Sequence, residues 1–389
     1  MKSAICIHNA TVLTGFSIME ECAVYIEDKK IVDVFSESRF NKKSFDNNVK
    51  FINAYGSYVA PGFIDTHLHG IGGYGTEDMD KNSILKMSEI LPKYGVTSFI
   101  PTIYSMPEPE LIKSIKSVVD AMGKEKGAHI LGMHLEGPFI SKERLGVQKE
   151  DSISPVDIEL MKRLIKASKN HIINMTVAPE LKDMRKLALF CLAQGIVLQA
   201  GHTNATYEQM LEGMQARILH TTHIFNAMSR MHHRDPGAVG AILIHPEMSC
   251  EIIADGVHIN PNLIKLLFKS KPLDRLVLIT DSLKPTKQKG SRLFANGEEV
   301  FFDNVFYRKS DKVIAGSAMT MIEGIKNLVS YGIKLEKAVK TATANPASIL
   351  KIQNKGLIVP EYDADLVIFN QNFEIINTII DGQIYQEKK

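Results

Sequence analysis

The run VAPGFIDTHLHG (59–70) is apolar along most of its length and ends in two histidines, His67 and His69. Side chains two residues apart on a β-strand point to the same face, so both imidazoles can reach one metal ion. A pair of this kind is weak evidence alone, because histidines are also common at surface and structural positions. The interpretation therefore depends on what the other strands of the chain carry at their ends.

Seven further β-rich runs follow along the chain. They are VTSFIPT (96–102), HILGMHLE (129–136), IINMTVAPE (172–180), IVLQAGH (196–202), ARILHTTH (216–223), SCEIIAD (249–255) and LVLITD (276–281). Most are continuously apolar, which is typical of strands buried on both faces. Helix-like segments lie between them, at residues 81–94, 109–122, 155–169, 184–194, 207–214 and 261–268. This alternation predicts an α/β protein with a TIM-like (β/α)8 barrel over residues 59–352, whose active site lies at the carboxyl ends of the strands.

Imidazole and carboxylate groups stand at the ends of four more of these runs. They are Glu136, His202, His223 and Asp281. Side chains of this chemistry, brought together from several strand ends, form the divalent metal sites with which proteins activate water. The sequence therefore predicts a metal-dependent hydrolase.

The two ends of the chain have a different pattern from its middle. Residues 4–34 and 364–385 contain short strand-like runs with polar turns between them. We expect residues 1–58 and 353–389 to form one small β-sandwich domain built from both termini. The polar segment 285–312, which contains FFDNVFY, interrupts the barrel pattern. It is expected to be a hairpin insertion or a mobile cover after the eighth strand.

Composition excludes several functional classes. The chain has 389 residues, 44% hydrophobic and 23% charged, as in a soluble globular protein. A net charge of +2 gives no argument for nucleic acid or a membrane surface, and we predict neither as a partner. No apolar stretch approaches the roughly 20 residues of a membrane span. The N-terminal residues show no signal-peptide pattern and the four cysteines form no CxxC pair, so we expect a reduced, cytoplasmic protein.

Several longer motifs resemble one known family. They are PGFIDTHLHG (61–70), HLEGPF (134–139), GHTNA (201–205), THIFNAM (222–228), DPGAVGA (235–241), ADGVH (254–258), TDS (280–282), AGSAMT (315–320), TATANPA (341–347) and DADLVIF (363–369). In this order, over nearly the whole chain, they resemble the N-acetylglucosamine-6-phosphate deacetylases of the amidohydrolase superfamily. The resemblance implies hydrolysis of N-acetylglucosamine 6-phosphate to glucosamine 6-phosphate and acetate, in amino-sugar catabolism.

The resemblance also implies a metal centre and a proton-transfer group. It makes Glu136, His202 and His223 the core ligands of a divalent ion. Members of the family differ in whether they keep the HxH pair, and this chain keeps both His67 and His69, so one or two ions per chain are expected. Histidine and carboxylate ligands suit zinc or iron and do not separate them. Asp281 is the expected general acid and base, which takes a proton from the attacking water and returns it to the leaving amine.

Substrate contacts follow from the same resemblance. Asn226 and Ala227 resemble the family's contacts to sugar and phosphate, and Arg234 and His258 resemble its phosphate ligands. An arginine offers a planar fork of donors that matches phosphate oxygens. In the family this arginine comes from the neighbouring subunit, so the resemblance implies a homodimer in which Arg234 reaches the partner's site.

Two further segments are implied to touch the substrate. Val147 and Gln148 align with a contacting pair whose second member is histidine in some homologues. Gln148 could still donate to the acetyl carbonyl, but it carries no charge. Ala315, Gly316 and Ser317 fall where a tight loop would line the pocket.

Three alternatives stay open from the sequence. The stretch SLKPTKQKGSRLFANG (282–297) departs from the family's usual small residues after Asp281, which leaves the sugar open. The same hydrolysis on another N-acetylhexosamine 6-phosphate, such as N-acetylgalactosamine 6-phosphate, is the nearest alternative. A dihydroorotase-like or N-acyl-amino-acid hydrolase is the second, and a non-catalytic binding or regulatory homologue that keeps the barrel is the third.

Overall fold

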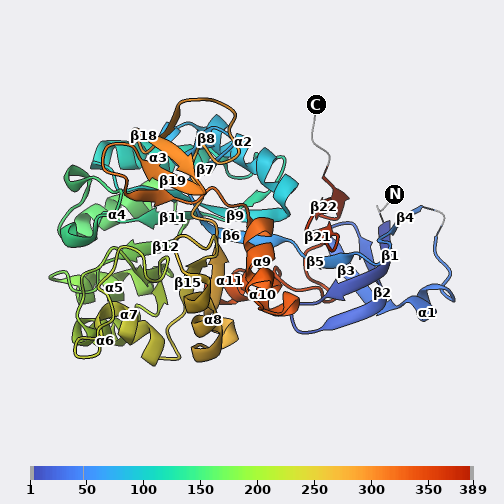
Figure 1. Cartoon of the computed structure of the whole chain (residues 1–389). Helices are drawn as coiled ribbons and strands as arrows, with labels where there is room; N and C mark the ends of the chain where they lie inside the picture. Colours follow the sequence, from blue (N-terminus) through green and yellow to red (C-terminus); the bar gives the residue numbers. More distant parts are fainter. Residues whose placement is uncertain (1–3, 47, 386–389) are drawn as a thin grey trace.

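The computed structural model describes residues 4–46 and 48–385, and it has two parts (Figure 1). One part holds most of the helices around a curled parallel sheet, and the other is a β-sheet that contains both the first and the last strands of the chain. Residues 1–3, 47 and 386–389, which belong to the expected terminal domain, lie outside the described residues. The division of the chain at residues 58/59 and 352/353 stays a prediction.

The curled sheet is built from eight strands in chain order. They are β6 (Phe63–Leu68), β9 (Val96–Ile103), β11 (Met133–Glu136), β12 (Ile172–Val177), β13 (Val197–Ala200), β14 (His220–Thr221), β15 (Cys250–Ile253) and β16 (Leu276–Ile279). Parallel ladders join β6 to β9 and continue through β11, β12 and β13 to β14, and a separate ladder joins β15 to β16. A short strand, β10 (His129–Ile130), also pairs with β9.

A few backbone hydrogen bonds rather than ladders connect these two groups of strands. The amide of Ser249 donates to the carbonyl of Leu219 at 2.9 Å, between β14 and β15. The amide of Asp281 donates to the carbonyl of His67 at 2.9 Å, between β16 and β6. The sheet is therefore (β/α)8-like, as predicted, but its ladder is not closed. The reason is local: β14 has only two residues, and the chain bends directly after it.

Helices alternate with these strands and cover the sheet (Figure 1). They are α2 (Lys81–Ile90), α3 (Glu108–Ala121), α4 (Ile158–Ala167), α5 (Met184–Ala193), α6 (Tyr207–Gln215), α7 (Gly237–Ile244), α8 (Pro261–Ser270), α9 (Met321–Ser330), α10 (Leu335–Thr341) and α11 (Ala344–Ile349). The six predicted helical segments are found, and α7 is among the helices that were not predicted. Its sequence GAVGAILI is apolar all round and its first six residues are buried, so it has no polar face for a periodicity argument to detect. Among the described residues, no helix combines the length and apolar character needed to cross a bilayer.

Strands from both chain ends form one sheet in the second part. They are β1 (Ala4–Leu13), β2 (Ile18–Glu27), β3 (Lys30–Ser36), β4 (Val49–Asn53), β5 (Tyr58–Pro61), β21 (Leu366–Phe369), β22 (Ile375–Ile380) and β23 (Gln383–Ile384). Their order is β23-β22-β21-β5-β1-β2-β3, with β4 paired to β1. We expected a sandwich, that is, two sheets. The long strand β1 pairs with β4 along its first half and with β5 along its second, which keeps all the strands in one hydrogen-bonded sheet.

The run 59–65, predicted as one barrel strand, is divided between the two parts. Tyr58–Pro61 pairs with β1 and β21 in the terminal sheet, and Phe63–Leu68 pairs with β9 in the curled sheet. Gly62 lies between them, and a Cβ atom there would stand 2.1 Å from Oγ1 of Thr97. Only glycine fits this crossing, so the histidine-bearing strand β6 follows the terminal sheet after a single residue.

The segment 285–312 contains the predicted hairpin. It contributes β17 (Leu293–Ala295), β18 (Glu298–Asp303) and β19 (Val305–Arg308) to a four-stranded antiparallel sheet completed by β20 (Ile314–Gly316). The turn between β17 and β18 is anchored to the barrel, because the amide of Asn296 donates to Oε2 of Glu77 at 2.9 Å. This insertion leads the chain directly back to the candidate site through β20.

Candidate metal centre

Three of the six residues predicted to bind metal or transfer protons have a strained backbone. His202, His223 and Asp281 have φ angles of 45°, 26° and 47°, in the left-handed region that residues other than glycine rarely adopt. Each follows the carboxyl end of a strand, at β13, β14 and β16. Strain of this kind clusters at functional sites, because only a specific demand on side-chain direction offsets its cost.

The first group of candidate ligands consists of Glu136, His202 and His223. Oε1 of Glu136 lies 3.1 Å from Nε2 of His202 and 3.1 Å from Nε2 of His223. The two Nε2 atoms are 3.2 Å apart. All three side chains are buried, and their ligand atoms converge on one point.

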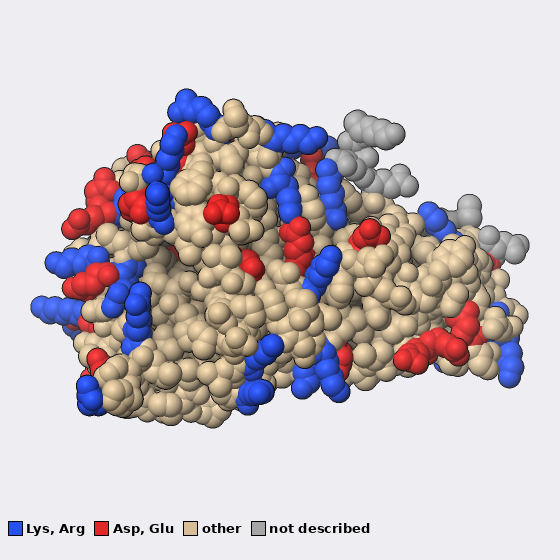
Figure 2. Space-filling view, in the orientation of Figure 1, with Lys and Arg blue, Asp and Glu red and all other residues tan. Residues whose placement is uncertain are grey.

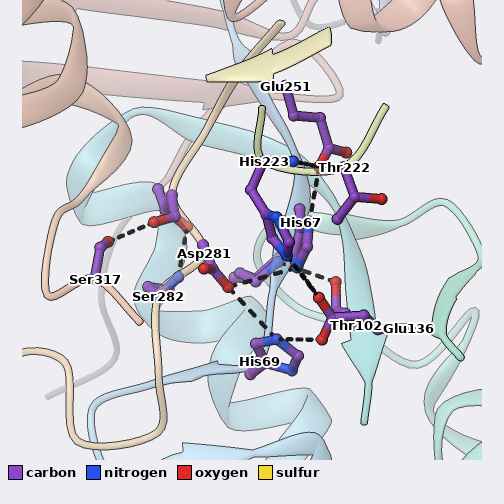
Figure 3. Close-up of polar contacts among 12 residues, drawn as sticks. His67, His69, Thr102, Glu136, Thr222, His223, Glu251, Asp281, Ser282 and Ser317 are labelled. Carbon is purple, nitrogen blue, oxygen red and sulfur yellow. Dashed lines mark hydrogen bonds and ion pairs between the residues drawn. The ribbon is translucent and has the colours of Figure 1, made fainter. Parts of the chain in front are cut away.

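The second group consists of His67, His69 and Asp281, and it adjoins the first (Figure 3). Oδ1 of Asp281 lies 3.5 Å from Nε2 of each histidine. The carboxylate of Glu136 lies between the groups: its Oε1 is 3.6 Å from Nε2 of His67 and its Oε2 is 3.4 Å from Nε2 of His69. The ring of His69 also stacks on Tyr104, with centroids 3.7 Å apart.

The donor atoms of both groups fit a divalent cation. Nε2 of His67 is buried and has no hydrogen-bond partner, although it points at the carboxylates of Glu136 and Asp281. Nδ1 of His202 lies 2.9 Å from the carbonyl of Arg144, which only accepts, so Nδ1 carries a proton and Nε2 is the ring atom directed at Glu136 and His223. Imidazole nitrogens and carboxylate oxygens facing one another in this way are a zinc- or iron-type ligand set.

Electrostatics keep the central carboxylate ionised. Burial alone would raise the pKa of Glu136, but the charge and hydrogen bond of His202 and the hydrogen bond of His223 hold this pKa well below its usual range. Burial likewise acts to raise the pKa of Asp281, whereas His69 and His67 lower it. Both carboxylates are therefore available as charged ligands or proton acceptors at neutral pH.

A cavity of about 260 Å³ opens onto both groups. It is lined by His69, Glu136, Gly146, Val147, His202, His223, Asn226, Ala227, His258, Asp281, Val313, Ile314 and Ala315. Of the expected substrate contacts, the structure thus brings Val147, Asn226, Ala227, His258 and Ala315 together around the cavity. Nδ1 of His258 is paired with Oδ2 of Asp255 at 2.6 Å, which leaves Nε2 as its other polar atom.

Gln148 bonds elsewhere. Its Nε2 donates to Oε2 of Glu136 at 2.6 Å, and its Oε1 accepts from the amide of Ser105 at 3.1 Å. Both ends of the amide are therefore engaged with the protein, and Gln148 contacts a candidate ligand rather than the cavity. The predicted bond to an acetyl carbonyl would need one of these two bonds to break.

Ser317, Gly316 and Arg234 lie outside the lining of the cavity. The amide of Ser317 donates to the carbonyl of Asp281 at 3.0 Å, so this residue holds the backbone of Asp281. Gly316 packs on the side chain of Leu283, from which a Cβ atom would be only 2.6 Å away. Arg234 is exposed, and its Nη1 is paired with Nε2 of His233 at 2.8 Å.

Sequence reasoning missed several residues around the site. Gly146, Val313 and Ile314 line the cavity without carrying any recognisable chemistry. Glu251 and Asp65 are buried carboxylates beneath it, bonded to His67 and Thr280 respectively. A signal for Glu251 was present, because it is a charged residue inside an otherwise apolar strand.

The fold and the site together define a class of protein, namely hydrolases that bind a divalent metal at the carboxyl ends of a (β/α)8-like barrel. Residues 58–385 match the amidohydrolase family. The chain is 32% identical to the N-acetylglucosamine-6-phosphate deacetylase of Bacillus subtilis over 392 residues, which cover 99% of this chain and 98% of that protein. The chain therefore belongs to the amidohydrolase family, and within it to the N-acetylglucosamine-6-phosphate deacetylases.

Solved structures agree with this assignment. The N-acetylglucosamine-6-phosphate deacetylase of Pasteurella multocida superimposes with a TM-score of 0.91 at 28% identity, covering 98% of this chain and 99% of that one. A mutant of the deacetylase of Mycobacterium smegmatis, solved in complex with N-acetyl-D-glucosamine-6-phosphate, gives a TM-score of 0.91 at 25% identity, with 98% and 99% coverage. The chain is accordingly an enzyme, a hydrolase of an amidohydrolase family.

Proposed function

We propose that the chain hydrolyses N-acetylglucosamine 6-phosphate to glucosamine 6-phosphate and acetate. The observation that carries the proposal is the convergence of Glu136, His202 and His223 within 3.2 Å of one another at the wall of a cavity sized for a small molecule. The substrate is inferred from the names of the relatives, and the reaction is inferred from the site. There an amide carbonyl and a water molecule could lie next to Asp281, whose carboxylate can accept a proton.

A divalent ion, zinc or iron, belongs to this proposal. Glu136, His202 and His223 would hold one ion, and His67, His69 and Asp281 would face a second, with Glu136 between them. When bound, such an ion supplies the Lewis acidity that polarises the acetamide carbonyl and acidifies water. Gln148 restrains the orientation of the Glu136 carboxylate, because its Nε2 donates to Oε2 at 2.6 Å.

Asp281 would perform the proton transfers. It accepts a proton from the water as the oxygen attacks the acetyl carbon, and it returns this proton to the nitrogen as the carbon–nitrogen bond breaks. The proton therefore ends on the amine of the amino sugar, and the water oxygen ends in acetate. The bonds from the backbone of Asp281 to His67 and Ser317 hold this carboxylate at the cavity wall.

Substrate recognition would use the lining residues of the cavity that are neither metal ligands nor proton-transfer groups. Val147, Asn226, Ala227, His258 and Ala315 line it and are the proposed contacts to sugar and phosphate. Arg234 is exposed and absent from this chain's own cavity lining, which supports a role at the site of a second subunit in a homodimer. A cytoplasmic location is part of the proposal, supported by four cysteines that are all buried and unpaired.

The test is acetate release from N-acetylglucosamine 6-phosphate, N-acetylgalactosamine 6-phosphate and their unphosphorylated forms, with and without a chelator. We expect the highest kcat/KM for N-acetylglucosamine 6-phosphate and loss of activity on chelation. A higher kcat/KM for N-acetylgalactosamine 6-phosphate would change the proposed substrate but leave the proposed hydrolysis unchanged. Absence of acetate release from all four compounds by the metal-loaded protein would refute the proposal.

The role of Arg234 has its own test. Charge-assisted bonds to phosphate contribute roughly 1.5–3 kcal/mol each, so Arg234→Ala should lower kcat/KM for the phosphorylated substrate by about 10- to 150-fold. Mixing this variant with Asp281→Asn should restore part of the activity, because hybrid dimers contain one intact site. If subunits exchange and no activity returns, Arg234 does not act across an interface.

A further inference from the structure

Glu251 is a buried carboxylate that the proposed reaction does not use. It lies on β15, within the apolar strand CEII, and none of its surface is exposed. It does not line the cavity, and Figure 3 shows it beside His223, on the side of His67 away from Glu136 and His69. An ionised carboxylate without water is costly unless its oxygens accept hydrogen bonds, so its partners indicate what it is for.

Every hydrogen-bond partner of this carboxylate is a donor. Oε2 lies 2.9 Å from Nδ1 of His67 and 3.3 Å from the amide of His223. Oε1 accepts from Nε2 of Gln199 at 2.8 Å. The orientation of Gln199 is itself set, because its Oε1 accepts from Nδ2 of Asn174. A glutamine at position 251 would turn an NH₂ group toward one of these donors, so the site requires a carboxylate.

The bond to His67 determines where that imidazole carries its proton. In the neutral ring, with Nδ1–H donated to Glu251, the lone pair is on Nε2, the buried atom without a hydrogen-bond partner that faces Glu136 and Asp281. The same carboxylate oxygen accepts from the backbone of His223, a member of the other group of ligands. Glu251 therefore contacts one residue from each group, from the side opposite the cavity.

We propose that Glu251 is a positioning residue, which fixes the tautomer and direction of His67 and so determines whether an ion is held by His67, His69 and Asp281. The inference rests on the proposed metal centre. Its effect falls on one group, because the imidazole of His67 bonds to Glu251, whereas His223 donates only its backbone amide to this carboxylate. Outer-sphere partners of metal-bound histidines typically change metal affinity by about 10- to 100-fold.

The experiment compares the metal content of the wild type and Glu251→Gln. Each stripped protein is titrated with Zn²⁺ and followed by calorimetry, and the absorption bands of the Co²⁺-loaded forms report each site's geometry. We expect two ions in the wild type. In Glu251→Gln we expect an unchanged first ion and a second ion bound about 10- to 100-fold more weakly, with turnover restored by excess metal.

Gln199→Leu is the matched control. It breaks the same buried chain of hydrogen bonds on the other oxygen of Glu251 and leaves the His67 bond in place. Both variants should lose thermal stability, but only Glu251→Gln should lose the second ion. Equal loss in both variants would show that Glu251 acts through packing alone and overturn the proposal.

Two further outcomes are decisive. If Glu251→Gln does not fold, Glu251→Asp is titrated instead, since it keeps the charge and is one methylene shorter. An unchanged second-ion affinity in that variant would overturn the proposal, and weaker binding would support it. A wild type that binds one ion also overturns it, whereas acetate release by the wild type tests the proposed reaction separately.

Discussion

The two groups of candidate ligands differ in how they are held. The ligand atoms of Glu136, His202 and His223 lie 3.1–3.2 Å from one another, so this group is already assembled from three separate strands. In the other group, His67 and His69 each lie 3.5 Å from Asp281, and the histidines are fixed from outside by Glu251 and Tyr104. We therefore expect the Glu136 group to bind its ion tightly. The affinity of the His67 group for an ion should depend on Glu251 and Tyr104, which hold its histidines in place.

The comparison is tested most severely by removing the preassembled group. His202→Ala or His223→Ala takes away one of three converging ligands, so the metal of this group and turnover should be lost together. Elemental analysis and acetate release measure both effects, and circular dichroism checks that the barrel stays folded. Full metal content in both variants would end the assignment of this group as the primary site.

Asp281→Asn is expected to have the next largest effect. The substitution keeps the shape of the side chain but removes its proton acceptor, so kcat should fall by about 10²-fold or more while the ion of the first group stays bound. Steady-state kinetics on a metal-replete sample measure this change. Turnover near the wild-type rate would move the proton transfer to another residue.

Replacing both His67 and His69 with glutamine sharpens the comparison at the second group. Metal content should fall from two ions to one, because the ligands of the first group are untouched. The measurement is metal stoichiometry per chain, with the Glu136 group serving as the internal control. A stoichiometry equal to that of the wild type would mean that the HxH pair holds no ion.

The smallest effect is expected at Tyr104. Its ring stacks on His69 at 3.7 Å and 7°, and such pairs contribute about 0.5–1.5 kcal/mol beyond burial. Tyr104→Leu should therefore weaken the second ion by at most about 10-fold and leave the first unchanged. Competition with a chromophoric chelator resolves a change of this size. Equal weakening of both ions would show that the two groups are not supported independently.

Much of the barrel and of its ligand set could be predicted because strand ends are easy to find in this sequence. The apolar runs mark where β13, β14 and β16 lie, and a histidine or an aspartate follows each run within a few residues. Since parallel strands present their carboxyl ends on one side, these side chains had to converge. Asn226, Ala227 and His258 were placed by resemblance alone.

Other features depend on contacts that no local pattern contains. The division of residues 58–68 at Gly62 is set by the close approach of Thr97, which is distant in the sequence. Gln148 was expected to face the substrate, yet its amide bonds to Glu136 and Ser105, because these partners lie within reach only after folding. The single terminal sheet depends on β1 pairing with two strands at once, which a propensity argument does not reveal.

The position of Gly62 limits where the chain can be cut, either for circular permutation or to isolate the barrel. Since β5 ends at Pro61 and β6 begins at Phe63, the barrel is topologically an insertion into the terminal sheet, entered through one residue and left before β21. The strand that carries His67 is therefore tethered directly to that sheet. Circular permutation that joins the chain ends and opens an exposed turn, such as Asp28–Lys29, preserves this tether. Cutting the chain at Gly62 to isolate the barrel would free the amino end of β6. The barrel is therefore expected to need the terminal sheet for catalysis.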